Sequence, residues 1–77
     1  MPVWKLTATD PDNPAWTAAG RRDEAIVRAA SEGAARRITA AAFEAPSWTD
    51  PSLVTAEALD DPRYDPKGKS EVLEPAA

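Results

Sequence analysis

The sequence predicts a small α+β domain: a three- to four-stranded antiparallel or mixed sheet packed on one α-helix, in the order β-β-α-β-(β). Two patterns lead to this class, an alternating segment near the start and an alanine-rich helical segment near the middle. The chain has 77 residues and no cysteine. We therefore expect residues 1–77 to form one domain with a thin core, because a chain of this size buries only about 60 % of its unfolded surface.

The first element is a strand over residues 3–9, where apolar and polar residues alternate. Trp4, Leu6 and Ala8 fall on one face, and Lys5, Thr7 and Thr9 on the other. A period of two with aromatic and aliphatic residues is typical of a strand with one buried face. Residues 10–20 follow as a loop, and we expect Trp4 to pack between sheet and helix.

Residues 21–45 allow two interpretations. One is a single long helix, rich in Ala, Arg and Glu. The other, which we favour, is a strand over residues 24–29 and a helix over residues 32–44, with Ser31 as N-cap. The β-branched pair Ile26–Val27 and the early Gly33 support this division. The predicted buried stripe of the helix is Ala34, Ala35, Ile38, Ala41 and Ala42, with Arg36 and Arg37 facing outward.

The third strand is expected over residues 53–59. A helix is the alternative, because Asp50 can cap a helix that has Pro51 in its first turn. We favour the strand because Asp60 and Asp61 would oppose the helix macrodipole at its end. The sheet face away from the helix would carry Lys5, Thr7, Thr55 and Glu57. From about residue 60 the chain is turn-rich, with residues 70–73 as a last edge strand.

Four Asp-Pro dipeptides divide the chain into these short segments. Proline cannot continue a sheet ladder, and the preceding aspartate can accept a hydrogen bond from the backbone just ahead of it. Each pair therefore predicts a turn. The dipeptides are Asp10-Pro11, Asp50-Pro51, Asp61-Pro62 and Asp65-Pro66.

Several segments together resemble a group of short bacterial proteins of uncharacterised function. They are the opening residues 1–6 (MPVWKL), the stretch 26–29 (IVRA) that leads into Ser31 and Ala35-Arg36, and residues 61–64 (DPRY). The resemblance implies a strand, a turn and an alanine-rich helix in the middle of the chain. It implies no activity and no catalytic residue.

Composition removes most catalytic chemistry. The chain has no histidine and no cysteine, so it lacks the side chain that titrates near neutrality, a thiolate nucleophile and the usual zinc ligands. The densest carboxylate group is Glu57, Asp60, Asp61 and Asp65, which we interpret as solvated turn residues. We therefore expect no enzyme activity, no catalytic residue, no cofactor and no metal site.

The net charge of −4 opposes binding to nucleic acid or to an anionic membrane. A nucleic-acid accessory role remains the alternative, because Arg36 and Arg37 on the helix, with Arg21, Arg22 and Arg28 nearby, could form a basic face. No apolar run is long enough to span a bilayer and no signal peptide is visible, so the expected location is cytoplasmic.

Trp16 and Trp48 lie in proline-flanked loops, where a large aromatic side chain either clamps the loop or anchors an interface. The candidate interface residues are therefore Trp16, Trp48, Arg36 and Arg37. The function predicted from these observations is a non-catalytic interaction or accessory module. Its partner would be an unidentified protein or a second copy of the chain.

Overall fold

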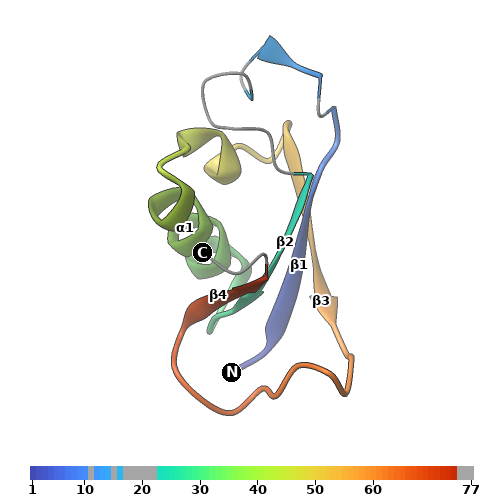
Figure 1. Cartoon of the computed structure of the whole chain (residues 1–77), viewed down its shortest axis with the longest axis vertical. Helices are drawn as coiled ribbons and strands as arrows, with labels where there is room; N and C mark the ends of the chain where they lie inside the picture. The colour runs from blue at the N-terminus through green and yellow to red at the C-terminus, as the bar shows by residue number, and fades with distance from the viewer. Residues whose placement is uncertain (11, 15, 17–22, 75–77) are drawn as a thin grey trace.

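The computed structural model describes residues 1–10, 12–14, 16 and 23–74, and it confirms the predicted α+β class. The strands are β1 (Val3–Ala8), β2 (Glu24–Arg28), β3 (Val54–Leu59) and β4 (Glu71–Glu74); the helices are α1 (Glu32–Phe43) and the short 3-10 helix η2 (Pro46–Thr49). The strands form one antiparallel sheet in the order β3-β1-β2-β4, with α1 beside β2 and β4 (Figure 1).

Both ambiguous segments have the predicted structure. The centre divides into β2 and α1, and the N-cap is Ser31, whose hydroxyl accepts a hydrogen bond from the N–H of Ala34 at 3.2 Å. Residues 54–59 form a strand that pairs with β1 along its whole length. The carboxylate of Asp50 caps a turn instead of a helix, since it accepts the N–H of Ser52 at 2.8 Å.

The predicted orientation of α1 is wrong in part. The helix buries Ala35, Arg36 and Thr39, while Ala41 and Ala42 are exposed. The reason is a polar contact that hydrophobic periodicity does not detect. Arg36 Nη1 donates a 2.8 Å hydrogen bond to the carbonyl oxygen of Val54, which turns this side of the helix toward the sheet.

The core lies between the sheet, α1 and η2, and two tryptophans fill one end of it. Trp16 and Trp48 are each about 1 % exposed, and their rings meet edge to face with centroids 5.1 Å apart. Phe43 at the end of α1 contacts Trp48 in the same manner at 5.6 Å. Trp4 packs at the periphery of this core and donates its indole N–H to the carbonyl of Ala29 at 3.1 Å.

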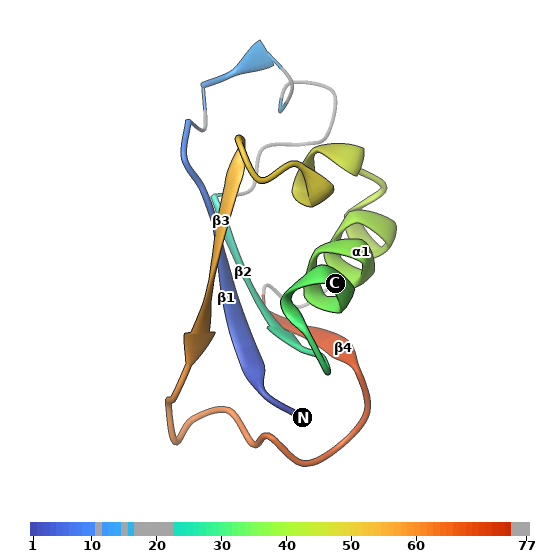
Figure 2. The same ribbon diagram turned by 180° about the vertical axis from the view of Figure 1, so that it is seen from behind.

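The sheet face away from α1 carries Lys5, Thr7, Thr55 and Glu57, as the register with β1 requires. Residues 60–70 join β3 at one edge of the sheet to β4 at the other edge, and they run past the end of the sheet where the chain begins (Figure 2). On this face Val3, Ile26 and Arg28 are buried. The turn-rich segment therefore provides a small second layer.

Three of the four predicted Asp-Pro turns form as expected. Asp50, Asp61 and Asp65 each accept the backbone N–H of the residue two positions later, at 2.8, 2.9 and 2.8 Å respectively. The fourth turn includes Pro11, which lies outside the described residues. Two of the three turns, those of Asp61 and Asp65, shape residues 60–70, which we call the crossing segment.

Candidate functional site

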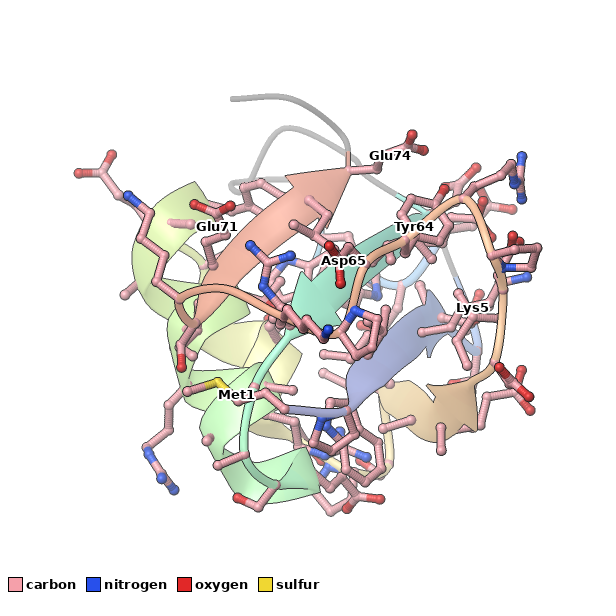
Figure 3. The ribbon with its side chains drawn as sticks, turned by 90° about the horizontal axis from the view of Figure 1, so that it is seen from below. Met1, Lys5, Tyr64, Asp65, Glu71 and Glu74 are labelled. Carbon is pink, nitrogen blue, oxygen red and sulfur yellow. The ribbon has the colours of Figure 1, made fainter. Side chains whose placement is uncertain are left out.

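A groove beneath the crossing segment and the outer edge of β3 are the two features of the described chain that we consider as ligand sites; a smaller hollow of about 280 Å³ lies beside the groove, between Lys5, Tyr64 and Glu74. The groove has a volume of about 510 Å³ and lies between residues 58–66 and the start of β1. Figure 3 shows Tyr64 and Asp65 on the crossing segment, with Lys5 on the neighbouring strand. The groove lining mixes prolines, aliphatic side chains and carboxylates: Pro2, Val3, Ala58, Leu59, Asp60, Asp61, Pro62, Tyr64, Asp65 and Pro66.

Asp61 and Tyr64, two polar groups of the groove, are engaged within the chain. Asp61 accepts hydrogen bonds from the guanidinium of Arg63 at 2.8 to 3.2 Å, and these bonds lower the pKa of the Asp61 carboxyl below its usual 3.8. Partial desolvation and a hydrogen bond with Glu74 raise the pKa of Tyr64 above its usual 10.0. Asp61 is therefore ionised and Tyr64 protonated at pH 7, so neither is suited to proton transfer near neutrality.

Metal binding gains no support from the described residues. Among them, no group of three His, Cys, Asp or Glu side chains is arranged to hold a metal ion. The carboxylates of Asp50, Asp61 and Asp65 are instead used to cap turns.

The lowered pKa of Asp61 predicts how acid affects stability. Because its pKa is lower in the folded chain than in the unfolded chain, its contribution is present above about pH 4 and is lost as the pH falls below that value. We expect Asp61→Asn to weaken the acid dependence of the melting temperature between pH 5 and pH 2.5. Asp10→Asn is the control, and equal acid dependence in both variants would contradict the account.

The structure places the four candidate interface residues in different environments. Trp16, Trp48 and Arg36 are buried within the chain, and only Arg37 is exposed. Three of the four therefore have no surface to offer a partner, because each fills or links parts of the same molecule. Trp16 and Trp48 pack against each other inside the core.

The basic face expected on the helix is also dispersed. Arg28 lies on the opposite side of the sheet, where its guanidinium donates to the carbonyl oxygens of Lys69 and Asp65 at 2.8 Å each. It also pairs with the carboxylate of Glu71 at 3.0 Å. Arg21 and Arg22 lie outside the described residues. Of the five arginines considered for nucleic acid, Arg37 alone is described and exposed.

The outer edge of β3 is a feature that composition could not locate. β3 is an edge strand, paired only with β1 among the strands of the described chain. Thr9 N–H donates to the carbonyl of Leu53 at 2.9 Å. This bond establishes which residues of β3 direct their backbone groups toward β1 and which direct them away from it. By this alternation, the backbone groups of residues 55, 57 and 59 point toward β1, and those of Val54, Ala56 and Ala58 point outward.

In one of the three outward-pointing residues, Val54, both backbone groups already form hydrogen bonds within the chain. The carbonyl of Val54 accepts the 2.8 Å hydrogen bond from Arg36, and its N–H donates to the carbonyl of Asp50 at 3.0 Å. Ala56 and Ala58 remain as the open part of the ladder. We call residues 55–59, with these two open positions, the β3 edge.

On the helix side of the sheet, the β3 edge lies beside Trp4 of β1. α1 packs over β2, β4 and β1, while η2 contacts β3. Figures 1 and 2 show α1 well away from the lower half of β3. Here the sheet presents half-buried Trp4 and Ala56 and exposed Ala58, with Trp4 directly opposite Ala58 in the register. Two small side chains of β3 thus lie beside a large aromatic side chain of β1.

No protein-family model matches the sequence, and no significant similarity to a curated protein or to a solved structure was found. The resemblance to short bacterial proteins therefore stays a prediction. No helix of the described residues is long and apolar enough to cross a membrane.

Proposed function

We propose that the protein is a non-catalytic interaction module that binds an extended segment of a partner protein at the β3 edge. The observation that carries the proposal is the pair of open positions at Ala56 and Ala58 on a regular, six-residue edge strand. An extended chain can add to such an edge by forming main-chain hydrogen bonds, and the flanking side chains then select its sequence.

The other edge of the sheet is less suited to this role. β4 has four residues, and its pairing with β2 has a register shift between Ile26 and Val27. Short strands and bulges are the features by which proteins protect their sheet edges. β3 has neither protection, since its six residues pair with β1 in continuous register.

A proline substitution on the outer edge of β3 tests the proposal. Peptides that bind the wild-type protein would first be selected from a random phage-displayed library, and each would then be measured against Ala58→Pro. This change removes an outward N–H but no bond to β1, so an edge strand tolerates it. We expect the selected peptides to lose at least tenfold in affinity.

Ala58→Ser is the matched control, because it keeps the backbone N–H and a small side chain. Binding to this variant should stay within about twofold of wild type. The proposal fails if the library yields no binder, or if the binders recognise Ala58→Pro as well as they recognise the wild-type chain. Far-UV circular dichroism of each variant verifies that the sheet is intact.

A further inference from the structure

We infer that the β3 edge accepts a segment in which a basic residue is flanked by large apolar residues, supplied by a different protein and not by a second copy of this chain. This inference rests on the proposed function and names the chemistry of the partner. Alternate side chains of the added strand would point to opposite faces of the sheet, so each set would meet different side chains of β3.

On the face away from α1, the surroundings of the β3 edge are acidic. Glu57 is exposed at the middle of the open stretch, and exposed Asp60 follows at its end, whereas the carboxylate of Asp61 is paired with Arg63 at 2.8 Å. Lys5 lies opposite Glu57 on β1, but its ammonium is directed to the carboxylate of Glu24 at 3.6 Å. A residue added opposite Glu57 would lie within about 5 Å of it, where a Lys or Arg is favoured and an acid is disfavoured.

On the helix side, the added residues would lie opposite Ala56 and Ala58. These positions lie on the same face of the sheet as half-buried Trp4, which is directly opposite Ala58 on β1. A large aliphatic side chain at each position would cover the exposed methyl groups and bring apolar area out of water. The preferred segment thus alternates large apolar, basic and large apolar residues.

The same geometry disfavours self-pairing. Two antiparallel copies of β3 use all four open residues only in the register centred on residue 57, which pairs Ala56 of each copy with Ala58 of the other. That register sets Glu57 directly against its own copy. Like charges in direct opposition destabilise a strand pair. Glu57 therefore selects against a second copy and in favour of a basic partner.

Two synthetic peptides test the inference: acetyl-Thr-Leu-Lys-Leu-Thr-amide and the same peptide with Glu in place of Lys. Their binding to the full chain would be followed by NMR chemical-shift titration. We expect the Lys peptide to bind the wild type about fivefold to tenfold more tightly than the Glu peptide. Glu57→Lys should reverse this preference, whereas Asp10→Lys, with the same change in net charge, should leave it unchanged.

The outcomes separate this inference from the function on which it rests. Binding that depends on residue 58 but does not distinguish the two peptides overturns the charge preference and leaves the docking edge in place. If neither peptide binds and the phage library is also empty, both proposals fail. A wild-type dimer in sedimentation equilibrium that Ala58→Pro dissociates would overturn the choice of a different protein as partner. A wild-type monomer that dimerises on Glu57→Thr substitution supports it.

Discussion

Trp48→Ala is expected to lower the free energy of unfolding by about 3 to 5 kcal/mol, the usual cost of truncating a fully buried tryptophan. Trp48 is about 1 % exposed and contacts both Trp16 and Phe43 edge to face. Its loss therefore removes the packing partner of Trp16 and of the end of α1 together. A domain of this length has roughly 4 to 12 kcal/mol in total, so the variant should be largely destabilised.

Urea denaturation followed by far-UV circular dichroism measures this effect without relying on tryptophan fluorescence. Trp4→Ala is the control, because Trp4 is only half-buried at the periphery of the core. We expect Trp48→Ala to shift the midpoint more than Trp4→Ala does. The opposite order would contradict a larger stabilising role for the buried Trp16–Trp48 pair than for Trp4.

Arg28→Ala is expected to cost about 3 kcal/mol, because hydrogen bonds to a charged group contribute about 1.5 to 3 kcal/mol and water replaces part of this at the accessible acceptors. One guanidinium bonds the carbonyls of Lys69 and Asp65 and the carboxylate of Glu71. It thereby holds the crossing segment and the start of β4 against the sheet. Arg28→Lys should recover only part of this loss, because an ammonium cannot reproduce the planar fork of donors.

Gly68 provides an independent test of the same contact. It has a φ of +125°, and an added Cβ would lie 2.8 Å from Nη2 of Arg28. Gly68→Ala should thus be destabilising, and less so in an Arg28→Ala background, where the backbone strain remains but the clash is gone. Gly33→Ala is the control: in the first turn of α1 it should be neutral or slightly stabilising. Strictly additive effects of Arg28→Ala and Gly68→Ala would contradict the contact.

Local patterns were sufficient to predict the elements of the fold. Alternation identified β1, the Ser31 cap located the start of α1, and the acidic pair Asp60–Asp61 favoured a strand over a helix at residues 53–59. The Asp-Pro turns formed for the reason expected, because the carboxylate accepts a nearby N–H within its own segment. Each of these features depends on residues close together in the sequence.

The roles of Arg28 and Arg36 could not be predicted in this way. Each side chain bonds backbone carbonyls far away in the sequence, at Val54 for Arg36 and at Asp65 and Lys69 for Arg28. A carbonyl acceptor is present at every residue, so the sequence contains no local signal for such a pair. The β3 edge was missed for a related reason: strand order, which decides the edges of a sheet, depends on long-range pairing.

Amide hydrogen exchange at residues 55–59 tests the central claim most directly, with and without the acetyl-Thr-Leu-Lys-Leu-Thr-amide peptide. In the free protein, the N–H groups of Thr55, Glu57 and Leu59 should be protected by β1, while those of Ala56 and Ala58 exchange rapidly. Saturating peptide should slow exchange at Ala56 and Ala58 selectively. Protection of these two amides without peptide, or no change when it is bound, would contradict a docking edge on β3.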